Sequence, residues 1–135
     1  MRRSEIVASI IDALKPLGIP LYEWRVAPAE YEELPIIVVR DKEDHIDAAE
    51  ISASAKHTLQ IEIEYTTAKK DLSTQDIREA VSSIFAAIKK EDDEKPIAEF
   101  IAPKSVDIDL EHNEVIIGRG IMEIEITYYT EIWGV

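Results

Sequence analysis

The stretch KHTLQIEIEYTTA, residues 56–68, decides the fold class of this 135-residue chain. Apolar and polar side chains alternate along it, one set being Leu59, Ile61, Ile63 and Tyr65 and the other Gln60, Glu62, Glu64 and Thr66. Because successive side chains of a strand point to opposite faces of a sheet, this alternation predicts a β-strand. One face of the strand should join an apolar core, and the other should be polar.

Two amphipathic helices are predicted, one on each side of this strand in the sequence. The first ends at Gly18, and its apolar residues recur at helical spacing: Ile6, Ile10, Ala13, Leu14 and Leu17. The second covers STQDIREAVSSIFAAIKK, residues 73–90. Ser73 is its predicted N-cap, and Asp76 three residues later completes a variant of the capping box.

Two more strands are predicted between the first helix and residue 56. LYEWRVAP, residues 21–28, alternates in polarity and ends at a proline, which indicates a short strand. LPIIVVRD, residues 34–41, is a continuous run of mainly branched apolar residues and predicts a buried strand. The polar residues 41–54 that follow are predicted to form a long loop.

The C-terminal third is predicted to be two or three strands. A turn is expected near His112, and Gly118 and Gly120 predict a bend or bulge. In the last strand, one face is formed by Met122, Ile124, Ile126 and Tyr128. The full order is therefore α-β-β-β-α-β-β-β, in a single domain over residues 1–135. Hairpin-like links favour an α+β fold, with a mostly antiparallel β-sheet and two main helices packed on one face.

Composition argues against several classes of function. The net charge is −13 and the isoelectric point is near 4.6. Nucleic acids and anionic membranes both require a basic surface, so neither is an expected partner. The absence of cysteine excludes disulfides, thiolate catalysis and zinc–thiolate sites. No apolar run reaches transmembrane length and no signal-peptide pattern is present, so we expect a soluble cytoplasmic protein.

No motif for catalysis, metal binding or cofactor binding emerges. The histidines, His45, His57 and His112, lack a second ligand at metal-binding spacing and are interpreted as exposed or edge residues. The acidic run over residues 41–47 resembles a calcium loop, but it lacks the mid-loop glycine and the closing glutamate. A solvated loop is the favoured interpretation there, and a weak divalent site is the alternative. Paired glutamates such as those at 62 and 64 follow from strand alternation more simply than from acid–base chemistry.

Aromatic residues near the C-terminus point to a different kind of function. In ITYYTEIWGV, residues 126–135, Tyr129 shares a strand face with Thr127 and with glutamates. Tyrosine and tryptophan are enriched at the centres of protein–protein interfaces. The polar face therefore indicates a protein-binding surface, with plain solvation as the alternative.

Several segments resemble the tail terminator, or tail completion, family of long-tailed bacteriophages and prophages. The resemblance covers the N-terminal helix, LPIIVVRD with its polar continuation, HTLQIEIEY, and the capped helix STQDIREAVSSIFAAI. It ends in GIMEIEITYYTEIW, a long strand with a Y-x-T-x-x-W pattern at Tyr128, Thr130 and Trp133. These are strand patterns and not chemical signatures. The resemblance implies an α+β fold with helices packed on a sheet.

The resemblance also implies a structural protein that is not an enzyme and needs no cofactor. Such proteins form a ring, usually a hexamer, on the head-proximal end of the tail tube, stop its polymerisation and join it to the head. The implied partners are other copies of the chain, the tail tube protein and the head-completion protein. The implied location is the host cytoplasm during assembly and then the head–tail junction of the virion. From position and chemistry, we predict these interface residues: Asp41, Glu43, Asp44, His45, Tyr129 and Trp133.

Three alternatives remain open from the sequence. One is a phage head-completion or neck connector protein of similar size and acidity. Another is a small acidic inhibitor or DNA mimic, although here the acidic charge is spread over all segments. The third is a small enzyme, for which no constellation of residues was found.

Overall fold

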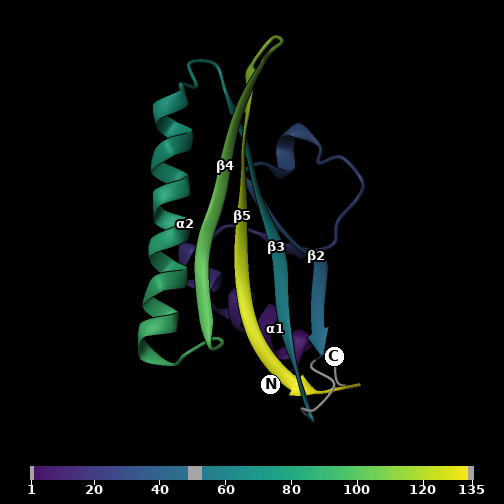
Figure 1. The fold of residues 1–135 in the computed structure, drawn as a ribbon. Helices are drawn as coiled ribbons and strands as arrows, with labels where there is room; N and C mark the ends of the chain where they lie inside the picture. Colours follow the sequence, from purple (N-terminus) through teal and green to yellow (C-terminus); the bar gives the residue numbers. More distant parts are fainter. Residues whose placement is uncertain (1, 49–52, 134–135) are drawn as a thin grey trace.

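The computed structural model describes residues 2–48 and 53–133, and Figure 1 shows their arrangement. The elements, in chain order, are α1 (Arg3–Leu14), η1 (Lys15–Leu17), β1 (Leu21–Glu23), η2 (Tyr31–Glu33), β2 (Ile36–Ala48), β3 (Ser54–Lys69), α2 (Thr74–Glu94), β4 (Phe100–His112) and β5 (Ile116–Glu131). Both predicted helices are present, but α1 ends at Leu14 and is followed by the 3-10 helix η1 before Gly18, and α2 continues past residue 90 to Glu94. The capping box at Ser73 and Asp76 is present at the start of α2.

The α+β class is confirmed, but the predicted element order α-β-β-β-α-β-β-β and the mostly antiparallel character of the sheet are only partly correct. Across the described residues the sheet has five strands in the order β1-β2-β3-β5-β4. It is mixed, because β1 pairs with β2 in parallel while the other neighbours are antiparallel. After α2 the chain forms two long strands and not three, since β5 runs through both glycines without interruption.

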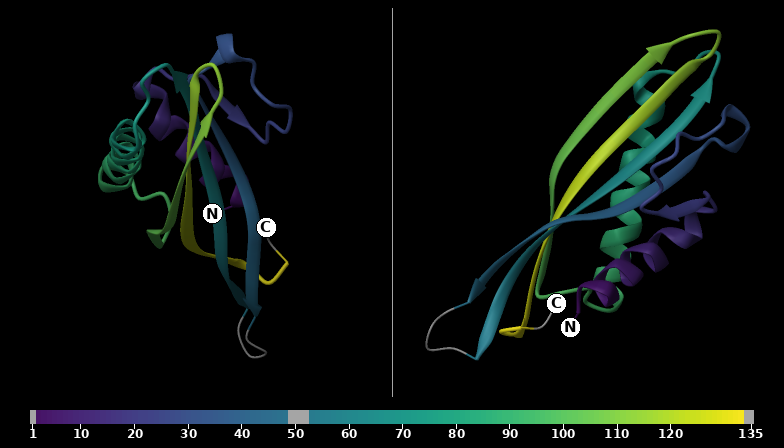
Figure 2. Two further views of the ribbon diagram at one scale, coloured as in Figure 1. Left: turned by 90° about the horizontal axis from the view of Figure 1, so that it is seen from above. Right: turned by 90° about the vertical axis from the view of Figure 1, so that its right-hand side faces the viewer.

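α1 and α2 cover the same face of the sheet, as the side view in Figure 2 shows. We call this the helix-side face and the opposite one the outer face. Alternate residues of β3 and β5 are buried on the helix-side face, as predicted: Leu59, Ile61 and Ile63 from β3, and Met122, Ile124, Ile126 and Tyr128 from β5. They pack with the apolar sides of both helices in a single core.

Gly118 and Gly120 have a different role from the predicted bend or bulge. The register of β3 with β5 continues unbroken past both residues. A Cβ atom at Gly118 would lie only 2.6 Å from Leu72 Cδ2 and 2.7 Å from Ile77 Cδ1. Glycine in this strand therefore marks the place where Ile77 in the first turn of α2, and Leu72 just before the N-cap, approach the sheet closely.

The predicted loop over residues 41–54 is also wrong where the structure describes it. β2 continues to Ala48 and pairs with β3 as far as Ala48 opposite Ala55, while residues 49–52 lie outside the described part. A polar sequence can form this strand because the paired backbone of β3 supplies the hydrogen bonds, whatever the side chains. The register shifts between Asp41 and Asp44, which marks a bulge.

The predicted strand over residues 21–28 is shorter than expected and stops at Glu23. Trp24 has a left-handed backbone conformation, with φ of 55°. This conformation is uncommon for a residue with a bulky side chain, and it turns the chain out of the sheet direction. The Trp24 N–H still donates to the carbonyl oxygen of Val39, so the turn stays attached to β2.

Candidate functional site

A polar network lies inside the helix-side face, where β2, β3 and β5 extend together. It consists of Asp44, His57, Tyr128 and Thr130. The Tyr128 hydroxyl donates to Asp44 Oδ2 over 2.6 Å. His57 Nδ1 lies 3.1 Å from both carboxylate oxygens of Asp44, and His57 Nε2 lies 2.8 Å from Thr130 Oγ1. Three strands are thus joined by side chains as well as by the backbone.

His57 and Tyr128 form the centre of this network. Both side chains are fully buried, and their rings stack with centroids 4.3 Å apart. Because the carboxylate of Asp44 accepts hydrogen bonds, we assign a proton to His57 Nδ1. The sequence-based interpretation of His57 as an exposed or edge residue is therefore wrong.

The N-terminus of α1 is fastened to the same region through Asp41. The Arg3 guanidinium donates to Asp41 Oδ2 and to the carbonyl oxygen of Lys42, and the Trp24 indole N–H donates to Asp41 Oδ1. A further Arg3 nitrogen lies 3.8 Å from Asp44 Oδ2, which links this cluster to the polar network. The left-handed turn at Trp24 is what brings its indole to β2.

The environment shifts two pKa values in opposite directions. Burial, together with the hydrogen bond to Asp44, raises the pKa of the Tyr128 hydroxyl far above its usual value. Burial acts in the same upward direction on Asp41, but the hydrogen bonds from Trp24 and Arg3 outweigh it and lower the pKa of that carboxyl overall. The native fold therefore favours a neutral Tyr128 and an ionised Asp41.

The hydroxyl of Thr130, the imidazole of His57 and the carboxylate of Asp44 occur in the order known from nucleophilic hydrolases. The Thr130 hydroxyl donates to the backbone carbonyl oxygen of Glu131 over 2.7 Å. The same oxygen lies 2.8 Å from His57 Nε2, and the fully buried imidazole has no exposed surface at which a substrate could bind. This arrangement joins three strands inside the protein.

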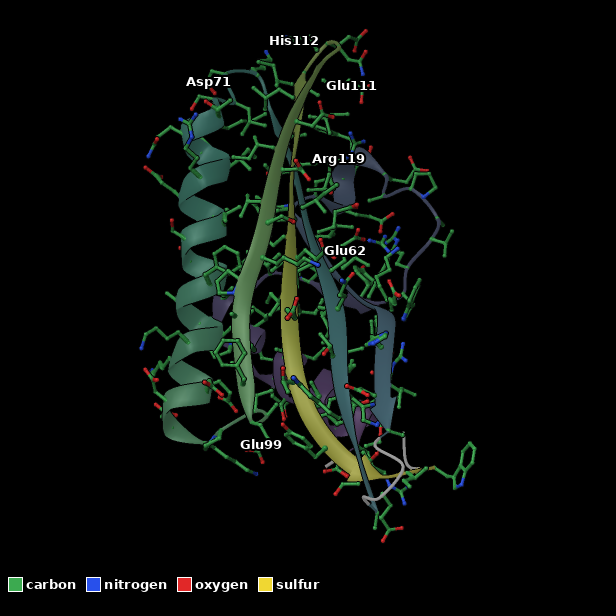
Figure 3. All side chains as sticks on the ribbon, in the orientation of Figure 1. Glu62, Asp71, Glu99, Glu111, His112 and Arg119 are labelled. Carbon is green, nitrogen blue, oxygen red and sulfur yellow. The ribbon has the colours of Figure 1, made fainter. Side chains whose placement is uncertain are left out.

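The outer face of the sheet carries charges of both signs. Arg40 lies 3.0 Å from a Glu62 oxygen and 3.7 Å from a Glu64 oxygen. Arg119 lies 3.6 Å from carboxylate oxygens of Asp109 and Glu111, and Figure 3 shows Glu62 near the middle of the sheet, with Arg119 and Glu111 nearer the β4–β5 turn. Glu62 and Glu64 are thus both paired with Arg40.

The predicted interface residues separate into two groups in the structure. Asp41 and Asp44 point inward, and their side chains are only 18% and 5% exposed. Glu43, His45 and Tyr129 are exposed, and Trp133 is 94% exposed. Only the second group is placed to contact a partner without rearrangement. We call Tyr129 and Trp133, at the end of β5, the aromatic end.

Sequence reasoning missed the polar network, although part of its signal was present. His57 precedes Leu59 by two residues, so it has the same parity as the buried side of β3, and Tyr128 continues the buried side of β5. Nothing in the sequence places Asp44 beside them, because its position depends on the bulge after Asp41.

Within residues 2–48 and 53–133, no group of three or more histidine, aspartate or glutamate side chains could hold a metal ion. None of the helices described is both long and apolar enough to cross a membrane. A search against models of known protein families found no match, and a search of curated proteins found no significant relative.

Proposed function

We propose that this chain is a structural assembly protein that forms a ring on the head-proximal end of a phage tail tube. In this role it stops tube polymerisation and provides the surface to which the head attaches. Its partners are other copies of the chain, the tail tube protein and a head-completion protein. It acts in the host cytoplasm during assembly and then stays at the head–tail junction.

The observation that carries this proposal is the aromatic end. Trp133 is 94% exposed and Tyr129 is 49% exposed, and they lie at or just after the end of β5, whose position Figure 1 shows. Large aromatic side chains left in water at one end of a sheet are typical of a surface that a partner covers.

The charge distribution supports an assembly role over binding to nucleic acid. A net charge of −13 keeps free subunits apart through self-repulsion, and a matching surface overcomes this repulsion locally. In a ring, each subunit uses two different surfaces, one for each neighbour, and the series of contacts closes when the last subunit meets the first.

Two measurements test the proposal. Light scattering during size exclusion, over a range of protein concentrations with and without magnesium, gives the mass in solution, and we expect conversion from monomer to a ring of about six. Adding the protein to polymerising tail tube protein should then yield shorter tubes with one capped end in electron micrographs. Tubes of unchanged length and uncapped ends would refute the terminator function. Binding to a head-completion protein without any effect on tubes would favour the neck connector.

A further inference from the structure

An apolar groove lies between α2 and β4 on the helix-side face. Phe85, Ala86 and Ile88 line it from α2, and Ile101 and Pro103 line it from β4. Its volume is about 440 Å³, and Ile124 of β5 forms part of its wall. On the rim, Lys89 donates to Asp93, four residues later in α2. The groove is thus an apolar trough with charged borders.

The apolar surface continues from the groove along β4. Val106 lies opposite Met122 and Ile108 lies opposite Gly120, so both point to the helix-side face. They are nevertheless 42% and 36% exposed. β4 therefore presents an apolar stripe beside α2 that no described element of the chain covers.

The aromatic end lies on the other side of the molecule from this groove. Trp133 follows β5 by two residues, and the end of β5 is remote from α2 in both Figure 1 and the view from above in Figure 2. A single subunit thus carries an exposed aromatic side chain on one side and an apolar groove on the other.

We propose that Trp133 of one copy docks in the α2–β4 groove of a second copy. This inference rests on the proposed ring and names the contact that builds it. Because the donor and acceptor surfaces differ and lie on opposite sides, the contact is head-to-tail. Such a contact leaves one free donor and one free acceptor at the ends of every open chain, and it ends only when a ring closes.

The area that a docked tryptophan would bury and the charges around both surfaces bear on the strength of this contact. A buried aromatic side chain removes about 150–250 Å² from water, roughly a quarter of the 800 Å² that each partner buries in a standard interface. The single contact is therefore weak, and ring closure strengthens it because the last contact is intramolecular. Lys56 and Glu131 near the aromatic end carry one charge of each sign, and the groove rim carries Lys89 together with Asp92 and Asp93, so docking does not bring only like charges together.

Two variants test each side of the contact separately. Trp133→Ala removes the donor, and Ala86→Arg fills the groove from an exposed position on α2, where arginine suits a helix. Ser83→Arg is the matched control, because Ser83 is exposed on the same helix and does not line the groove. Sedimentation velocity should show self-association weakened about thirtyfold or more in the first two variants, as for an interface hot spot, and unchanged in the control.

Mixing the two defective variants gives the decisive result. The Ala86→Arg chain keeps its tryptophan and the Trp133→Ala chain keeps its groove. At protein concentrations well above those at which the wild type forms rings, as a single weak contact requires, the mixture should form a one-to-one dimer that cannot grow. Circular dichroism should show that each variant is folded. A mixture that stays monomeric, or a Trp133→Ala protein that assembles like the wild type, overturns the docking.

Cysteine cross-linking provides a second readout, because the natural chain contains no cysteine. A chain with both Glu131→Cys and Lys89→Cys, which keeps Trp133, should give an oxidised ladder of oligomers that ends at the ring, whereas Glu131→Cys with Ser83→Cys should not. If the wild type forms rings and caps tubes but the ladder is absent, the docking is wrong and the proposed function stands. If the ladder forms but tubes are not capped, the docking is right and the terminator function is wrong.

Discussion

Replacing Asp44 by alanine should be one of the most destabilising single changes in this chain. The Asp44 carboxylate accepts hydrogen bonds from the Tyr128 hydroxyl and from His57 Nδ1, and its side chain is only 5% exposed. Hydrogen bonds to a charged group are worth about 1.5–3 kcal/mol each, and removing one partner leaves the others buried without an acceptor. We therefore expect a loss of about 3–5 kcal/mol, the range found when a buried charged pair is broken. Small domains have a total stability of about 5–15 kcal/mol, so this is a large fraction of it.

Urea unfolding at pH 7, followed by circular dichroism, measures this loss directly. Asp47→Ala is the matched control, because Asp47 lies on the same strand with an exposed side chain, and its change should stay within about 0.5 kcal/mol. Asp44→Asn keeps one acceptor oxygen and should fall between the two. The comparison requires equal slopes with urea, since a changed slope means a changed unfolded state. If Asp44→Ala unfolds at the same urea concentration as Asp47→Ala, the network does not stabilise the fold and the reasoning fails.

Gly118→Ala should cost about 1–3 kcal/mol by overpacking, since the new Cβ would lie 2.6 Å from Leu72 Cδ2; an unchanged urea midpoint would mean that α2 can move away. Burial, and secondly the hydrogen bond to Asp44, raise the pKa of the Tyr128 hydroxyl. The contribution of Tyr128 to the free energy of unfolding is therefore complete below about pH 10 and declines as the pH rises further. In Tyr128→Phe the free energy of unfolding should therefore fall less steeply with pH above that value than in the wild type. Equal slopes in the two proteins would contradict this. The net lowering of the Asp41 pKa means that its contribution is present above about pH 4 and is lost as the pH falls through the native value. Acid unfolding of Asp41→Asn should consequently be less steep than that of the wild type, and an identical acid curve would show that the carboxylate contributes nothing.

The sequence predicted best where the pattern is local and regular. The alternation in β3 and on the buried side of β5, and the capped start of α2, appear in the structure as predicted. It failed in β2, whose second half is polar on both faces and is held by pairing with β3. It failed also at Gly118. A glycine in a strand often marks a bulge, but here it makes room for the side chains of Leu72 and Ile77.

The sequence by itself determined the α+β class, the two amphipathic helices, the buried side of the central strands and the strongly acidic surface. These properties depend on neighbours within a few residues, or on a simple sum of charges, so periodicity and composition are sufficient to find them. Only the tertiary structure brought Asp44, His57 and Tyr128 together, residues up to 84 positions apart, through a bulge and a strand register that no local pattern encodes. Only the tertiary structure, too, set the exposed Trp133 and the α2–β4 groove on opposite sides of one subunit, because strand order and helix placement result from packing the whole core at once.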